Sequence, residues 1–271
     1  MKKILSLLLV IFMLFSMLCL ASCEQENSSS SEESSTQSEQ ARLLSSAITK
    51  NEELDAYIAK MTIKVDVTIG QMMLTIPMTI DMVVENARSE NPVLSAIMTT
   101  TVLGQKQTTK LYNDGSWLYL EENGEGYKIK PENAGDEYDY VGNIEDIVKD
   151  LPEDALSLAG LNVKNDGTVE IAVALADEQF NQLFADAVAT AGGTQFALDG
   201  VDLSNGKVRV AIDKEGFIKT YELQFLLEMT VEEQVTSANV TAKVEFNGRG
   251  EGIKAEPMQG YQAFEEATVE K

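Results

Sequence analysis

Two consecutive runs of sequence, YIAKMTIKVDVTI at residues 57–69 and MMLTIPMTIDMVV at residues 72–84, decide the fold. In both runs apolar side chains largely alternate with polar ones, which is the period of a strand that buries one face. Gly70-Gln71 between them indicates a turn, so the stretch predicts one long antiparallel hairpin. Pro77 in the second run lacks a backbone N–H, which favours an edge strand or a bulge there.

The same alternation continues towards the C-terminus. Asn113-Asp114-Gly115 is a strong hairpin signal, and a glycine-containing turn follows at residues 123–126. A tail that includes Pro257 and residues 261–264 is expected to lie over a sheet edge. Further strands are predicted at residues 93–103, 106–112, 116–121, 127–130, 168–175, 207–212, 217–229 and 235–247.

Three segments carry apolar residues at helical spacing. They predict helices at residues 41–54, at residues 142–150 ending before Pro152, and from an N-cap at Asp177 onward. Long antiparallel strands with one apolar face need a cover, and these helices can supply it. We therefore predict an α+β fold, in which a strongly curved antiparallel sheet, an open half-barrel, wraps around the helices in a single domain at residues 41–271.

The N-terminus has the pattern of an export signal. Lys2-Lys3 is followed by an uncharged apolar run at residues 4–20, which is marginally short for a membrane span of roughly 20 residues. Leu20-Ala21-Ser22-Cys23 then resembles the lipobox of bacterial lipoproteins. The resemblance implies that residues 1–22 are a signal peptide, that cleavage occurs between Ser22 and Cys23, and that Cys23 carries a diacylglyceryl group.

A polar segment separates this cysteine from the domain. Residues 24–40 are mostly Ser and Glu with no apolar residue, so residues 23–40 are predicted to form a lipidated, disordered tether. Seventeen such residues span roughly 20–25 Å as a coil. Because two acyl chains give durable attachment, we expect a protein anchored in the cell membrane on its extracytoplasmic side, with the membrane as partner through Cys23.

Composition excludes several classes of function. The net charge of −23 repels phosphate, which argues against nucleic-acid binding, and it also disfavours anionic lipid head groups. The chain has no His, and its two Cys, Cys19 and Cys23, both lie in the N-terminal segment. Ser-His-Asp and Cys-His catalysis and His-ligated zinc are therefore excluded, and no acid pair has a spacing that suggests glycosidase chemistry. We expect no enzyme, no metal site and no cofactor.

The chain resembles the superfamily of the periplasmic lipoprotein carriers LolA and LolB and the mycobacterial lipoproteins LppX and LprG. It is more closely similar to uncharacterised Gram-positive lipoproteins of that fold. The resemblance implies a concave apolar face that accepts acyl chains, and it favours a host with one membrane. It is carried by the lipobox, the Ser/Glu tether and three further segments, at residues 54–57, 113–119 and 212–217.

The sequence offers one set of candidate ligand-binding residues. They are side chains expected on adjacent strands, where flexible thioethers can adapt to ligands of varied shape. The alternative, which core packing favours, is that the same methionines pack under the helices and that the tryptophan is a rim or core aromatic. The candidates are Met61, Met72, Met78, Met82, Met98 and Trp117.

Two functions of different class follow from these patterns. The first is a membrane-tethered monomer that binds a lipid or other hydrophobic ligand in an apolar cleft between sheet and helices. The alternative is a structural or protein-interaction module of the cell envelope with no small ligand. A carboxylate-dependent enzyme would require two acids that project into one cleft.

Overall fold

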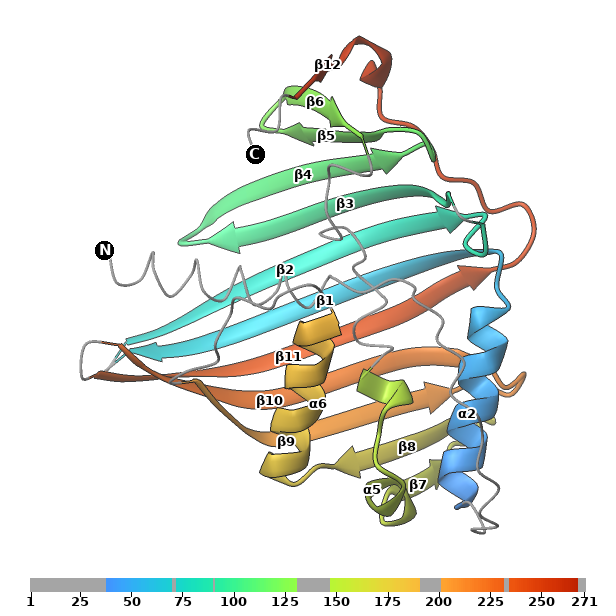
Figure 1. Cartoon of the computed structure of the whole chain (residues 1–271), viewed down its shortest axis with the longest axis vertical. Coiled ribbons are helices and arrows are strands. Elements are labelled where there is room, and N and C mark those ends of the chain that lie inside the picture. The colour runs from blue at the N-terminus through green and yellow to red at the C-terminus, as the bar shows by residue number, and fades with distance from the viewer. Residues whose placement is uncertain are drawn as a thin grey trace.

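A single open sheet of twelve strands dominates the computed structural model, which describes residues 38–69, 72–89, 91–130, 147–190, 201–231 and 234–267 (Figure 1). The first six strands are β1 (Ala56–Ile69), β2 (Met72–Glu85), β3 (Val93–Val102), β4 (Gln105–Asn113), β5 (Leu118–Glu122) and β6 (Glu125–Ile129). The others are β7 (Gly160–Val163), β8 (Val169–Ala174), β9 (Val201–Ile212), β10 (Ile218–Val231), β11 (Gln234–Arg249) and β12 (Glu265–Glu266).

The sheet consists of two antiparallel meanders that meet along one seam. The strand order is β12-β6-β5-β4-β3-β2-β1-β11-β10-β9-β8-β7, so β1 of the first meander pairs with β11 of the second. This seam is antiparallel and runs from Tyr57 opposite Arg249 to Thr68 opposite Ser237. Residues from the beginning and the end of the domain therefore form the centre of the sheet.

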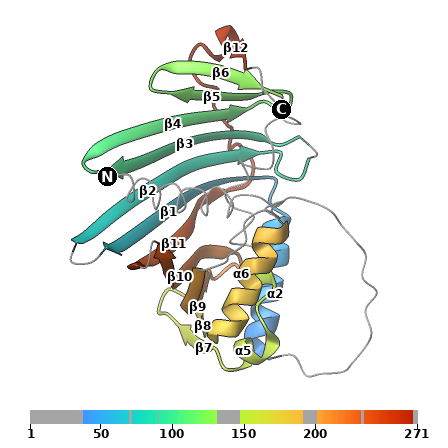
Figure 2. The same ribbon diagram turned by 60° about the vertical axis from the view of Figure 1, so that its left-hand side comes forward.

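Three helices lie against one face of the sheet. They are α2 (Glu39–Glu52), α5 (Glu153–Ser157) and α6 (Asp177–Thr190), and Figures 1 and 2 show them over the β7–β11 half. The hydroxyl of Ser38 caps α2 by accepting a hydrogen bond from the Ala41 N–H at 3.2 Å. Under α6 the rings of Phe180, Phe184 and Phe225 form a buried aromatic cluster.

The predicted α+β class, with an open antiparallel sheet and helical cover, is confirmed. The long hairpin at residues 57–84 is present as β1 and β2. The predicted helix at 41–54 begins at Glu39, so its first two residues fall within the range assigned to the tether. Sequence reasoning could not single out Ser38 as the cap, because it is one of many serines in a polar run.

Pro77 does not mark an edge strand, because β2 lies between β1 and β3. The pairing of β2 with β3 begins only at Met78, however, so that Pro77 lies just outside this ladder. The missing N–H of Pro77 thus falls where the β2–β3 ladder has already ended. The prediction of an edge strand was wrong for the strand as a whole and right for the local environment of the proline.

Two helix boundaries also differ from the predictions. Asp177 is the first residue of α6 rather than its N-cap, since the Phe180 N–H bonds to the carbonyl of Ala176. The Asp177 carboxylate instead accepts a hydrogen bond from the Asn205 N–H at 2.9 Å. Of the predicted helix at 142–150, residues 147–149 are helical and 142–146 lie outside the described residues.

The C-terminal tail lies over a sheet edge as expected, because β12 pairs in parallel with β6. The sequence patterns did not predict α5, β7 or β12. The predicted signal peptide at 1–22 and the tether up to residue 37 lie outside the described residues, as does Cys23. Within the described ranges, none of the helices has the length and apolar character that crossing a bilayer requires.

Candidate functional site

Strand register brings four of the five predicted methionines together on β1, β2 and β3. Residues directly opposite one another in a sheet present their side chains on the same face. Met61, Met78, Met82 and Met98 therefore share one face, which we call the methionine face. They lie in three adjacent rows of paired residues: Met61–Ile80–Met98, Ala59–Met82–Ala96 and Ile63–Met78–Thr100.

These side chains differ in their burial. Met61 and Met82 are each 3% exposed and belong to the hydrophobic core. Met78 and Met98 are half-buried and pack against that core. The burial of the first pair agrees with core packing, whereas the second pair retains accessible thioether surface on the same face.

Met72 lies apart from this group. It pairs with Ile69 at the far end of β2, and 62% of its surface is exposed. It points to the same face as the other methionines but is one of the last residues of the hairpin. The structure therefore assigns Met72 to the end of the sheet rather than to the methionine face.

The methionine face is chemically uniform. A polar group beside it, the hydroxyl of Thr100, is turned to the backbone and donates to the carbonyl of Pro77 at 3.3 Å. Thioether and aliphatic surfaces offer dispersion contacts and adapt to irregular shapes. This arrangement can bind an apolar group.

Trp117 is on the other side of the sheet. Its ring lies 4.0 Å from Lys130 Nζ and 4.9 Å from Lys128 Nζ, and Lys128 is directly opposite Tyr119 in the β5–β6 pair. Leu111 is directly opposite Ala96 and therefore lies on the methionine face. Its neighbour Tyr112 points to the other face, where it stacks on Tyr119. The alternation that buries Leu118 and Leu120 thus turns the neighbouring aromatic residues outward.

The C-terminal tail covers part of this outer face. The Tyr261 ring packs edge-on against Tyr112 and Tyr119, and Phe264 lies over Gly126, where an added Cβ would come within 2.3 Å of the ring. Burial, together with the hydrogen bond that the Tyr119 hydroxyl donates to Asp114, raises the pKa of Tyr119 to about 12. This phenol therefore stays protonated at neutral pH and acts as a packing group.

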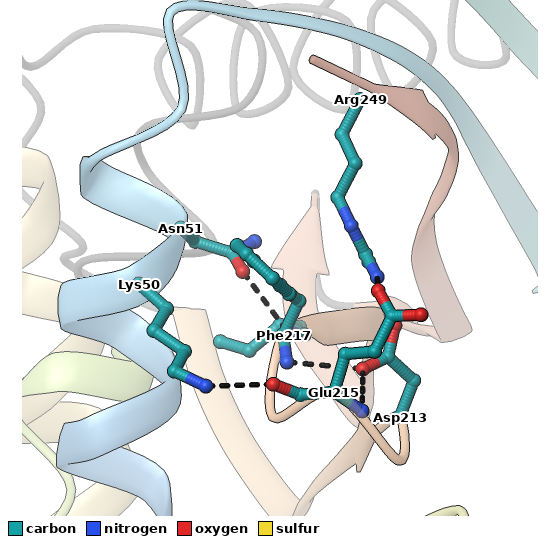
Figure 3. Close-up of polar contacts among 7 residues, drawn as sticks. Lys50, Asn51, Asp213, Glu215, Phe217 and Arg249 are labelled. Atoms are coloured by element: carbon teal, nitrogen blue, oxygen red, sulfur yellow. Dashed lines mark hydrogen bonds and ion pairs between the residues drawn. The ribbon is translucent and has the colours of Figure 1, made fainter.

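A polar cluster that no sequence pattern indicated ties α2 to the second meander (Figure 3). We call it the clasp, and its members are Lys50, Asn51, Asp213, Glu215, Phe217 and Arg249. Lys50 Nζ donates to the carbonyl of Glu215 at 2.6 Å. The side-chain oxygen of Asn51 accepts the buried N–H of Ile218 at 2.9 Å. Both contacts fix the end of α2 on the turn between β9 and β10.

Arg249 at the end of β11 completes the clasp. Its guanidinium pairs with Asp213 at 2.7 Å and with Glu215 at 2.6 Å, and it lies 4.0 Å from the centre of the Phe217 ring. The Asp213 carboxylate also accepts the N–H groups of Glu215 at 2.9 Å and Phe217 at 3.1 Å. Burial alone would raise the pKa of Asp213, but Arg249 and these two N–H groups outweigh it and hold the pKa below 3.8.

The contacts of the clasp indicate a structural role rather than a catalytic one. Arg249 occupies both of its carboxylates, and Asp213 is further committed to closing the turn. Within the ranges that the structure describes, no group of three or more His, Cys, Asp or Glu side chains is arranged to hold a metal ion. A turn at residues 213–216 was visible in the sequence, but nothing in the sequence indicated that Arg249 would reach it.

Comparison with known proteins gives a family and several structural matches. LprF from Mycobacterium bovis has 8% identity and a TM-score of 0.43, with 81% of this chain and 96% of that chain covered. The Mycobacterium tuberculosis lipoprotein LppX has 11% identity and a TM-score of 0.39, with coverage of 80% and 98%. A DUF1329 family protein from Desulfovibrio piger has 6% identity and a TM-score of 0.23, with coverage of 80% and 95%.

LppX also belongs to the superfamily that the sequence of this chain resembles. A comparison with curated proteins found no match. A family model described as a family of unknown function, DUF6612, matches residues 39–248.

Proposed function

This chain belongs to the DUF6612 family of unknown function, and from that starting point we propose that it is a lipid-anchored, extracytoplasmic protein that binds a lipid or another hydrophobic ligand on its methionine face. The proposal rests mainly on one observation. Met78 and Met98 are half-buried in adjacent rows of an otherwise apolar face, while the helices lie over the β7–β11 half of the sheet (Figure 2).

Apolar burial supplies the binding energy in this proposal. A hydrophobic ligand gains about 0.8 kcal/mol for each CH₂ group that it removes from water. The unbranched thioethers of Met78 and Met98 can follow an acyl chain without a fixed shape. We further propose that the sheet is strongly curved around its helices, which would give this face the concave form of a cleft.

Anchoring is the second part of the proposal. Residues 1–22 would be removed as a signal peptide, and the lipid on Cys23 would hold the domain at the outer side of the cell membrane through the tether at 23–40. The domain itself carries the acidic charge that head groups of anionic lipids repel. A Cys23→Ala variant should therefore move from the membrane fraction to the soluble fraction of fractionated cells. Retention in the membrane fraction would remove this part of the proposal.

Ligand binding is tested with paired variants of the full-length protein. Met78→Gln and Met98→Gln change the methionine face, whereas Thr79→Gln and Thr99→Gln change adjacent residues that point to the other face. Native mass spectrometry should detect a co-purified ligand in the wild type and in the threonine variants, with less in the methionine variants. Titration with the fluorescent fatty acid cis-parinaric acid should follow the same order.

Two results together would contradict the ligand hypothesis. Wild-type protein would be ligand-free in repeated preparations, and it would show no saturable binding of the fatty-acid probe. Circular dichroism spectra of all four variants must match the wild type, so that lost binding is not lost folding.

The second candidate function is an interaction module of the cell envelope. It is favoured by β7, an edge strand on which Leu161 and Val163 are exposed. Free backbone groups on such an edge can pair with a strand of another chain. Crosslinking on intact cells through a photoreactive residue at position 162 of β7 would capture that partner, while the fatty-acid titration would show no binding.

A further inference from the structure

Two hairpins present exposed apolar side chains at the same end of the sheet. Because β3 runs antiparallel to β2, the beginning of β2 and the turn between β3 and β4 lie at the same end of the sheet (Figure 1). Met72 and Met73 at the beginning of β2 and Leu103 in the β3–β4 turn are 62%, 76% and 73% exposed. We call these three residues the tip end. The register of β2 and β3 places Leu103 about 10 Å behind Met72 along the strands. Several exposed apolar side chains at one end of a sheet favour a contact surface there.

The backbone at Leu103 gives an independent reason to expect a contact. In the part of the chain that the structure describes, four non-glycine residues have positive φ, and three of them are asparagines: Asn86, Asn123 and Asn205. Asn tolerates this region because its short polar side chain bonds locally, whereas a leucine is strained there. Leu103 adopts φ of 51° with nothing in its side chain to compensate.

A second turn in the same sheet provides a direct comparison. Leu103-Gly104 has φ values of 51° and 80°, and Asn123-Gly124 has 54° and 86°. Both are two-residue hairpin turns of the kind that favours Asn-Gly. The chain therefore uses the favourable residue in one turn and a strained, exposed leucine in the other. Burial of the leucine side chain against a surface outside this chain would remove the cost of its exposure and would offset the backbone strain, which remains.

From this geometry we infer that the tip end rests on the surface of the lipid bilayer, with Met72, Met73 and Leu103 in the head-group region. The inference relies on the anchoring part of the proposed function but not on the ligand. Fifteen residues from Cys23 to Ser38 reach about 50 Å when extended. Strand β1, which separates the junction of α2 and β1 from the tip end, is roughly 45 Å long. The tip end therefore touches the membrane only when the tether is drawn out close to its full length, well beyond its coil span of roughly 20–25 Å, and the like charges of the tether favour such extension.

Backbone chemistry favours the tip end over the other exposed apolar surface. The β3–β4 turn closes its own ladder through the pairing of Val102 with Gln105. Among the described strands β7 is the last of the sheet, near the exposed Leu158 and Val163. An edge strand brings its outward N–H and C=O groups into a less polar environment, which costs several kcal/mol for each group in hydrocarbon. A lipid surface is thus the occupant that the tip end accepts more readily.

The experiment uses mature, lipidated protein in phosphatidylcholine vesicles, with one cysteine added for an environment-sensitive NBD label. The test positions are Leu103→Cys and Met73→Cys. Asn123→Cys is the matched control in the equivalent turn. Glu122, just before that turn, pairs with Thr109, which is four residues along β4 from its start at Gln105. The control turn therefore lies about 13 Å behind the β3–β4 turn along the strands. Lys214→Cys reports on the opposite end, and Leu158→Cys on the β7 side.

The fluorescence emission of NBD labels at positions 103 and 73 should shift to shorter wavelength. Doxyl lipids should quench these labels several-fold more than labels at positions 123, 158 or 214. Equal quenching at all positions, strongest quenching at 158, or none at 103 and 73 would overturn the inference. The chain without an added cysteine must not react with NBD, because Cys23 would be blocked by its lipid. Labelling of that chain would instead show that the anchoring proposal has failed.

Discussion

The two ends of the sheet are built in opposite ways. At one end the clasp joins α2, the β9–β10 turn and β11 through charged and amide groups that are mostly half-buried. At the other end, hairpins end in exposed methionines and a strained leucine. The clasp end is thus stabilised by polar contacts between elements, whereas the tip end leaves apolar side chains available for an external surface. Substitutions at the clasp should therefore change stability, and substitutions at the tip end should change it little or in the favourable direction.

The largest effect is expected for Asp213→Ala. It leaves Arg249 with one carboxylate fewer and leaves the N–H groups of Glu215 and Phe217 without their acceptor. Hydrogen bonds to charged groups contribute about 1.5–3 kcal/mol each, so we expect a loss of about 3 kcal/mol. Urea denaturation at pH 7 measures it. Asp213→Asn keeps an oxygen acceptor and should lose less, and Asp202→Ala, at an exposed position, should lose less than about 0.5 kcal/mol.

The pH dependence of this effect has a definite sign. The folded pKa of Asp213 lies below 3.8, so its ionised form stabilises the native state at pH values above 3.8. That contribution disappears as the pH falls through the folded pKa. The difference between wild type and Asp213→Asn should therefore shrink steadily below pH 3.8. A difference that grows in acid would contradict the assigned role of Asp213.

Asn51→Ala should have the next largest effect. The substitution removes the acceptor for the Ile218 N–H, and Ile218 is only 1% exposed. An unsatisfied buried donor costs about 1–3 kcal/mol, and we expect about 2 kcal/mol in thermal or urea unfolding. Asn239→Ala on β11, at an exposed position, is the control and should be close to neutral. Similar losses for both variants would show that Asn51 is not part of a special contact.

Leu103→Asn should stabilise the isolated protein. It places a residue that tolerates positive φ in a turn that now holds leucine, which should relieve about 1 kcal/mol of strain. The reverse substitution, Asn123→Leu in the matching turn, should destabilise by a similar amount. The two variants are compared by unfolding in urea without lipid. Destabilisation by Leu103→Asn would mean that the leucine has a partner within the chain.

Met73→Ser is expected to have the smallest effect. The side chain is 76% exposed, and such positions usually change stability by less than about 0.5 kcal/mol. Its unfolding curve should overlay that of the wild type, while quenching by doxyl lipids of a label at position 103 should decrease. A loss of stability as large as that of the clasp variants would remove the contrast between the two ends.

Local patterns predicted the strands well because each strand carries its own period. The alternation at 57–84 predicted β1 and β2 nearly to the residue, and it also placed Met61, Met78 and Met82 on one face. Short elements escaped: β7 has only four residues, too few for a period to be recognised, and α5 has only five. The side of the sheet on which Trp117 lies could not be predicted, because this residue is outside a strand and its side depends on the pairing of β5 with its neighbours.

The clasp could not have been predicted from local patterns. Arg249 reaches Asp213 only because β11 lies beside β10 and both run next to the end of α2. Strand order of this kind is set by the packing of the whole sheet rather than by any one segment. Asn51 illustrates the same limit, since its partner is 167 residues away in the sequence.

The seam between β1 and β11 has a consequence for how the chain matures. A polypeptide emerges N-terminus first, so the β1–β6 meander is complete long before residues 234–249 exist. During that interval the long inner side of β1 faces solvent as an unpaired edge, open to proteases and to strands of other nascent copies. Only release of the last part of the chain can close it. A premature stop just before β11 should therefore yield two orphaned half-sheets rather than a slightly shortened protein.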